Sequence, residues 1–297
     1  MEDNGLIKYY RDRKRGKDLT STKKHKDFRI LIGKQGDVKS HQTYLQTPEG
    51  IYYTKCASKA EIDAETVLSQ VFCKLGIQSA IYLPAGHKNK YVYAVSNDIT
   101  NENTILAKDY YEQFWENIRK DSNYSGTTIG QHPFYLPSIK EQVEIDYNKF
   151  ITPEAMRTLQ IVRGLDMASY NTDRNWCNYY FQMENGVITD IILIDHAMSG
   201  ANVESTLCEE LVNCLYFNEF NKILGRNNYS NIISNFKNNE VVQDIITPQE
   251  LAETVGSVNM MEEARDIKGT IGYKIDQGYL DVMAKSFDYT AEELLKP

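Results

Sequence analysis

The chain has 297 residues, of which 41% are hydrophobic, and it carries a formal net charge of −8. This composition is that of a globular protein with enough chain for a sizeable core, and no apolar run approaches the length of a membrane span. The five cysteines show no paired metal-ligand spacing, so we expect reduced thiols and neither a zinc site nor a disulfide framework.

The charge is distributed unevenly along the chain. Residues 1–40 carry a net charge of about +6 and the remainder about −14. The basic side chains cluster at Arg11, Arg13, Lys14, Arg15, Lys17, Lys23, Lys24 and Lys26. We expect residues 1–27 to form a basic, solvated leader, while contact with RNA, an acidic partner or an anionic lipid remains open.

A loop containing two glycines, Gly33 and Gly36, comes after the leader. Two strands are predicted over residues 43–46 and 51–55, joined by a Thr-Pro-Glu-Gly turn. The second strand ends in Lys55. A lysine in a strand is most often solvated, so any special role for this one depends on the next elements of the chain.

The next element is a helix, which we predict over residues 59–75. Ser58 and Glu61 have the spacing of a capping box, apolar residues recur at helical intervals, and Gly76 suits the carboxyl-terminal end. The helix therefore begins only a few residues after the strand lysine.

Two further strands are predicted over residues 80–83 and 91–95, because both segments are rich in aromatic and apolar residues. A second helix is predicted over residues 152–165. Thr152 is its expected N-cap, and Pro153 occupies the first helical position, where proline is favoured.

The segment after this helix, residues 171–178, has the sequence Asn-Thr-Asp-Arg-Asn-Trp-Cys-Asn. A β-hairpin comes next, with strands predicted over residues 179–183 and 187–194 around an Asn-Gly turn. The second strand ends at Asp195. The hairpin should therefore bring the end of the 171–178 loop close to Asp195.

The residue types at these positions indicate phosphoryl transfer. Asp173 could orient a substrate hydroxyl and accept its proton, while Asn178 and Asp195 could hold Mg²⁺ through hard oxygen ligands. An Asp and an Asn five residues apart are common in turns, so the motif alone is weak. It gains meaning from its order: helix, loop, hairpin and second aspartate.

These residues also resemble a known family. Asn171-Thr-Asp-Arg…Asn178, together with the later Leu193-Ile-Asp195, is similar to the HipA-type kinases and to the phosphatidylinositol kinases, their distant relatives. The chain departs from the family pattern at Asn175, where the family usually has His. It also departs from ordinary protein kinases, which have Phe-Gly after the second aspartate, by having His196-Ala197.

The resemblance, which extends over about residues 30–225, implies an α+β, bilobal protein-kinase-like fold. We expect residues 28–97 to form an N-lobe with an antiparallel sheet plus one helix, and residues 98–297 to form a mostly helical C-lobe. Helix starts in this second part are predicted at Thr206, Thr247 and Thr290.

In such a fold Lys55 would bind the phosphates of ATP and pair with an acid of the next helix. Glu61 is already assigned to the helix cap, so Glu65 is the expected partner of Lys55 and Asp63 the runner-up. Arg174 would support the catalytic loop through hydrogen bonds. The expected phosphate-covering loop supplies Gly33, Gly36, Lys39 and Ser40, and the expected adenine-binding hinge is Val95, Ser96 and Asn97.

The sequence thus predicts a kinase that uses ATP and Mg²⁺, with a serine/threonine of a protein as the expected acceptor. A lipid or small-molecule kinase and a nucleotide-binding pseudokinase, such as an antitoxin-associated partner module, remain alternatives. The start of the sequence shows no secretory signal, so we expect a cytoplasmic protein. Delivery elsewhere by a route that does not cleave the chain stays open.

Autophosphorylation is a testable hypothesis, because hydroxyl side chains lie close in sequence to the expected phosphate loop: Thr20, Ser21, Thr22 and Ser40. After incubation with ATP, mass spectrometry of the purified chain should find phosphate within residues 1–45. Finding none there would refute the hypothesis.

Overall fold

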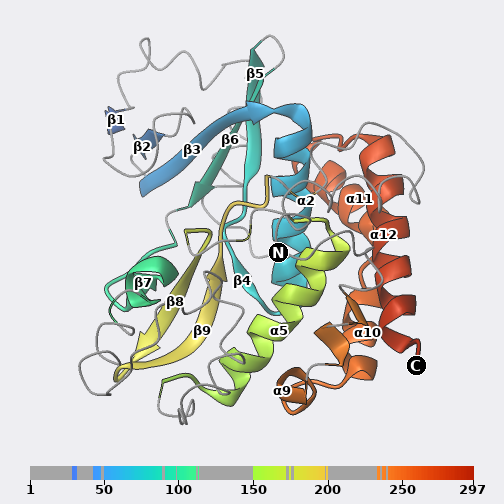
Figure 1. The fold of residues 1–297 in the computed structure, drawn as a ribbon. Helices are drawn as coiled ribbons and strands as arrows, with labels where there is room; N and C mark the ends of the chain where they lie inside the picture. The colour runs from blue at the N-terminus through green and yellow to red at the C-terminus, as the bar shows by residue number, and fades with distance from the viewer. Residues whose placement is uncertain are drawn as a thin grey trace, which may run out of the picture.

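The computed structural model describes residues 29–31, 43–47, 50–88, 91–97, 99–111, 113, 150–171, 174, 177–197, 199, 233–234, 236–238 and 240–297. Within these residues the chain forms two sheets and a layer of helices (Figure 1).

The first sheet has five antiparallel strands and occupies the upper part of Figure 1. In spatial order its strands are β1 (Arg29–Leu31), β2 (Thr43–Thr47), β3 (Gly50–Ser58), β6 (Tyr91–Asn97) and β5 (Leu83–Lys88). The predicted pairing of the second and third strands is present, with Thr47 opposite Gly50 across the turn. The central strand β3 therefore carries Lys55 between β2 and β6.

Helix α2 (Lys59–Lys74) comes directly after β3 and matches the helix predicted from the sequence. Ser58 is its N-cap, and both hydrogen bonds of the capping box with Glu61 are present. Every residue from Ile62 to Phe72 is buried. A helix buried on all sides is enclosed by other elements, and α2 indeed packs against the first sheet on one side and α11 (Met260–Ile271) on another.

The second sheet has the strand order β4 (Gln78–Ser79), β9 (Val187–Leu193), β8 (Tyr179–Glu184) and β7 (Thr104–Leu106). The predicted hairpin is confirmed as β8 and β9, and its turn residues Asn185 and Gly186 have φ angles of 51° and 82°, as a tight hairpin turn requires. The short β4 comes just after α2 and pairs in parallel with β9. The end of α2 is thereby tied to the strand that leads to Asp195.

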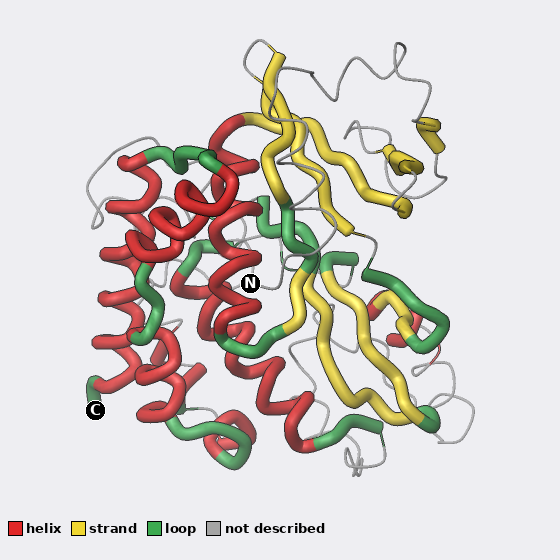
Figure 2. The backbone as a smooth tube through the Cα atoms, turned by 180° about the vertical axis from the view of Figure 1, so that it is seen from behind, coloured by secondary structure: helices red, strands yellow, loops and turns green. Residues whose placement is uncertain are grey.

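The helical layer lies along one side of the two sheets, as the view from behind shows most clearly (Figure 2). It contains α5 (Pro153–Ala168), α9 (Glu240–Gln243), α10 (Pro248–Gly256), α11 and α12 (Gln277–Leu295). The last helix, α12, packs against α5, α10 and α11.

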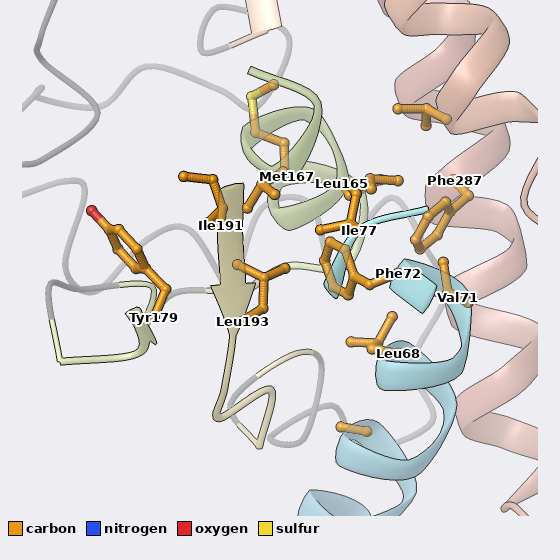
Figure 3. Close-up of a cluster of buried hydrophobic side chains, with 14 of the residues drawn as sticks. Leu68, Val71, Phe72, Ile77, Leu165, Met167, Tyr179, Ile191, Leu193 and Phe287 are labelled. Atoms are coloured by element: carbon orange, nitrogen blue, oxygen red, sulfur yellow. The ribbon is translucent and has the colours of Figure 1, made fainter. Parts of the chain in front are cut away.

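The main core forms where α2, α5, β9 and α12 converge (Figure 3). Its largest fully buried side chains include Phe72 of α2, Leu165 of α5, Ile191 of β9 and Phe287 of α12. Segments that are far apart in sequence thus share one apolar interior, which fixes α2 relative to the hairpin.

Several predicted elements are confirmed, and two are wrong. The strand predicted over 80–83 begins only at Leu83, because the N–H of Ala80 bonds to the carbonyl of Leu193 in the second sheet and Tyr82 packs in an apolar cluster with Ala57 and Ala94. Thr290 does not begin a helix. It lies within α12, and its hydroxyl donates a hydrogen bond to the carbonyl of Ser286 instead of capping.

Other predictions lie outside the described residues. They include the leader over residues 1–27 and the helix start at Thr206. The boundaries of the two predicted lobes also stay predictions. Among the residues that the structure does describe, no helix is both long enough and apolar enough to cross a lipid bilayer.

The contact between α5 and α10 can be tested at Gly164. A Cβ added at this residue would lie 2.7 Å from Cδ1 of the buried Leu251, whereas one added at Gly269 of α11 would meet nothing within 4 Å. We expect Gly164→Ala to lower the free energy of unfolding by about 1 kcal/mol, because overpacking outweighs the gain in helix propensity.

The matched control is Gly269→Ala, which should raise the free energy of unfolding by about 0.5 kcal/mol through helix propensity alone. Urea unfolding of both variants measures the difference. Equal stabilisation by the two substitutions would contradict the close packing at Gly164.

Candidate active site

Lys55 of β3 lies between two carboxylates. Its Nζ is 2.6 Å from Oε1 of Glu65 on α2 and 2.7 Å from Oδ1 of Asp195, which comes just after β9. The side chains of Lys55 and Glu65 are 7% and 0% exposed, and that of Asp195 is 29% exposed. The structure therefore joins the strand, the helix and the end of the hairpin through one ammonium group, and Asp195 is the member of the cluster that faces solvent.

The charges of this cluster depend on burial and on mutual attraction. Burial alone would lower the pKa of Lys55, but Glu65 and Asp195 reverse that effect and raise it. Burial would raise the pKa of Asp195, yet Lys55 holds it below its usual value. Burial raises the pKa of Glu65 to about 7 against the opposing effect of Lys55. At neutral pH, Lys55 is thus a cation and Asp195 an anion.

Asp63 was the runner-up as partner of Lys55, and the structure places it elsewhere. Its carboxylate accepts hydrogen bonds from the hydroxyl of Tyr273 and the backbone N–H of Asp276, so it faces the carboxyl-terminal helices. Glu61 is occupied with the N-cap, as expected.

Glu65 also holds the backbone just beyond Asp195. Its second oxygen, Oε2, accepts a hydrogen bond of 2.8 Å from the backbone N–H of His196. Asp195 itself has a φ of 57°, in the left-handed region that residues other than glycine uncommonly adopt. A strained conformation of this kind persists only where the surroundings impose it, and the contacts of Glu65 supply part of that constraint.

Arg174 joins the loop before the hairpin to the segment after it. Its guanidinium donates to both oxygens of the buried Asp166 at 3.0 and 3.1 Å, and to the backbone carbonyls of Asn178 and Ile194 at 2.9 and 2.7 Å. Asn171 donates to the same Asp166 carboxylate. The predicted supporting contacts of Arg174 are therefore present, and they reach both sides of the hairpin.

His196 takes part in the same network. Nη2 of Arg174, which can only donate, lies 2.9 Å from Nδ1 of His196, so Nδ1 is the acceptor and Nε2 carries the proton that is donated to Oγ of Ser79. The ring stacks on Phe72 of α2 with a centroid distance of 4.9 Å. Burial, together with the charge of Arg174, holds the pKa of His196 well below its usual value, so the ring is neutral.

The sequence marked His196 only as a departure from the protein-kinase pattern and gave no sign of this role. Its contacts span 117 and 131 residues along the chain, to Ser79 and Glu65. The apolar residues around Lys55 were also missed. Tyr82 is buried in a small cluster with Ala57 and Ala94, against which the partly buried Tyr53 and Ile194 pack.

Asn178 and Asp195, the predicted metal ligands, are brought together by the hairpin. The backbone carbonyl of Asn178 accepts a hydrogen bond from the N–H of Ile194, the residue before Asp195. Among the residues that the structure describes, no three His, Cys, Asp or Glu side chains gather as a metal site. One carboxylate and one amide suit Mg²⁺, which keeps most of its coordination for water and phosphate oxygens, and do not suit Zn²⁺.

The remaining predicted site residues are only partly described. Asp173, Gly33, Gly36, Lys39 and Ser40 lie outside the described residues. Val95, Ser96 and Asn97 form the end of β6 and pair with β3, and Val95 also pairs with Leu83 of β5. Their use as an adenine-binding hinge stays a prediction.

The network around Arg174 makes a prediction about stability. In Arg174→Lys, the single ammonium cannot serve Asp166, His196 and two carbonyls at once, so buried acceptors lose their donors. We expect the free energy of unfolding to fall by about 2–4 kcal/mol.

Arg157→Lys is the matched control, because Arg157 is exposed and only 3.5 Å from the exposed Glu250. It should change the free energy of unfolding by less than about 0.5 kcal/mol. Urea unfolding measures both variants, and similar small changes in the two would show that the Arg174 network does not contribute as argued.

Comparison with known proteins bears on the fold of the chain. No family model matches the chain, and no curated protein matches it. Among solved structures, the chain is similar to CtkA, a proinflammatory kinase of Helicobacter pylori, with a TM-score of 0.56 and 15% identity over 89% of this chain and 91% of that one.

A second solved structure is HipA of Shewanella oneidensis MR-1, in complex with HipB and operator DNA. It aligns with 92% of this chain and 69% of its own at 13% identity, with a TM-score of 0.43, which is too low to support a conclusion. The similarity to CtkA bears on the fold alone. The chain has the bilobal, α+β, protein-kinase-like fold that its sequence predicted.

Proposed function

We propose that this protein is an ATP- and Mg²⁺-dependent phosphotransferase whose acceptor is a serine or threonine hydroxyl of a protein. The observation that carries the proposal is the position of Lys55, whose Nζ lies within 2.7 Å of both Glu65 and Asp195. This arrangement places a fixed cation beside a solvent-facing carboxylate, which phosphoryl transfer needs and a purely structural core does not.

Lys55 is the proposed phosphate-binding group. A buried lysine whose pKa is raised stays charged, and Glu65 holds its ammonium in place. Oriented in this way, Lys55 can donate hydrogen bonds to the α- and β-phosphates of ATP.

Asp195 and Asn178 are the proposed magnesium ligands. Asp195 is ionised because Lys55 lowers its pKa, and Asn178 is fixed through its backbone carbonyl by Arg174 and Ile194. The metal, when bound, neutralises negative charge on the phosphates. The chain contributes two oxygen donors from the two sides of one hairpin.

Asp173 is the proposed base that orients the acceptor hydroxyl and accepts its proton. The residue lies outside the described part of the chain, but its neighbour Arg174 is held at four places: Asp166, Asn178, Ile194 and His196. These contacts fix Arg174, the residue next to the proposed base, against both ends of the hairpin.

The apolar residues near Lys55 suit the base of a nucleotide. Tyr53 shares one face of β3 with Lys55 and is only partly buried, as is Ile194, the residue before Asp195. Partly exposed side chains of this kind offer apolar contact to an aromatic ring, and residues 95–97 are the proposed hinge at its edge.

Phosphate transfer from labelled ATP tests the proposal directly. We expect the purified protein to label itself or an added protein, and Asp173→Ala to lower the rate by about 10²–10⁴, the usual contribution of a general base. Lys55→Met should lower the rate by a comparable factor, because the phosphates lose their fixed cation.

Lys268→Met, an exposed lysine of α11, is the matched control and should retain the wild-type rate. Equal background labelling by wild type and Asp173→Ala, with nucleotide still bound, would refute the enzymatic function and favour a pseudokinase. Phosphoamino-acid analysis of the labelled protein then identifies the acceptor residue.

A further inference from the structure

The side of α2 opposite Lys55 contains a second buried carboxylate, that of Asp63. The side chain of Asp63 is fully buried. Oδ1 accepts a hydrogen bond of 2.7 Å from the hydroxyl of Tyr273, and Oδ2 accepts one of 3.0 Å from the backbone N–H of Asp276. Nζ of Lys59, one turn earlier on α2, also donates a hydrogen bond to Oδ2 of Asp63.

Asp63 and Glu65 are two residues apart, so at about 100° per residue they point to nearly opposite sides of the helix. Glu65 faces Lys55 and the backbone of His196, while Asp63 faces the connection between α11 and α12. The helix α2 is thus held from both sides by hydrogen bonds to buried carboxylates.

The other end of α2 is held by the same part of the chain. Nζ of Lys74 lies 2.7 Å from Oε1 of Glu263 and 2.9 Å from Oδ2 of Asp266, both on α11. Together with Asp63, this gives attachment to residues 263–276 near both ends of the helix.

The last helix, α12, contacts the rest of the candidate active site. The hydroxyl of Ser286 on α12 donates to the carbonyl of Ala168, which lies just before the 171–178 loop. The hydroxyl of Tyr279 donates to the carbonyl of Ser199, four residues after Asp195. Residues 263–286 therefore contact α2, the helix before the catalytic loop and the segment after Asp195.

We propose that residues 263–286 form an internal brace that holds α2 in the position where Glu65 meets Lys55, and that Asp63 is the positioning residue through which the brace acts. This proposal rests on the proposed function in one respect only: it takes the Lys55 cluster to bind nucleotide.

The physical reason lies in the cost of moving α2. Any shift or rotation of the helix that separates Glu65 from Lys55 also withdraws Asp63 from Tyr273 and Asp276. A buried carboxylate without its donors is strongly unfavourable, so the brace opposes such a shift. The position of the active-site helix is consequently set by contacts on its far side.

Two substitutions test the brace. In Asp63→Asn, only one oxygen remains to accept hydrogen bonds. The new NH₂ group is itself a donor and faces another donor, so one of the hydrogen bonds is lost. In Tyr273→Phe, one donor is lost with little change in shape. The matched controls are Asp281→Asn, an exposed acid of α12, and Tyr289→Phe, also on α12.

The first measurement requires no nucleotide. Lys55 is labelled with an amine-reactive reagent under native conditions, and its modification rate is measured by mass spectrometry. The buried Lys237 serves as an internal standard, because general loosening of the protein exposes both lysines. We expect Asp63→Asn and Tyr273→Phe to raise the ratio of Lys55 to Lys237 modification about fivefold or more, which is the lower range of coupling between distant sites.

The second measurement is the affinity for Mg²⁺-ATP, by calorimetry. The same variants should bind about fivefold more weakly, and the controls should match the wild type. An unchanged Lys55 to Lys237 ratio in both variants would refute the brace, even if the wild type transfers phosphate. An equal rise in the modification rates of Lys55 and Lys237 would also refute it, because the substitutions would then act by lowering the general stability of the protein. If the ratio rises selectively but the wild type binds no nucleotide, the brace stands and the proposed function fails.

Discussion

One ammonium group shared by two carboxylates is the interaction on which the candidate active site depends. Nζ of Lys55, on β3, lies within 2.7 Å of Glu65 on α2 and of Asp195, which comes just after β9. Each of the three groups would be costly to bury alone, and each stabilises the charged form of another. The cluster therefore couples the positions of the three elements and is also a candidate for chemistry.

A second buried network connects Arg174 to both ends of the hairpin. Asp166 and Arg174 form an ion pair, and Arg174 extends it to His196, whose ring stacks on α2. The two networks meet at the backbone of His196, which donates to Glu65. A substitution in either network should therefore disturb the other, and double-mutant cycles between Arg174 and Glu65 would measure that coupling.

The sequence predicted those parts of the structure that local chemistry decides. The capping box at Ser58, the Thr-Pro start of α5 and the Asn-Gly turn of the hairpin each depend on residues close together in the chain. The order of these elements, together with the family resemblance of residues 171–178 and 193–195, predicted the fold. Within that fold, the ion pair of Lys55 with Glu65 was expected because Glu61 is assigned to the cap. Contacts between distant segments, such as that of His196 with Ser79 across 117 residues, have no local signal. At Thr290 a local signal was present but misleading. Threonine is a common N-cap, so a helix start was predicted there, whereas the residue is buried within the longer helix α12.

The two-residue strand β4 limits how the two sheets can move. Gln78 and Ser79 come shortly after α2 and pair in parallel with Ile192 and Leu193 of β9, and the N–H of Ala80 adds a further bond to Leu193. A rotation of the first sheet that keeps these hydrogen bonds must have its axis close to β4. Atoms near this axis, those of Ser79 and His196 among them, would move least in such a rotation.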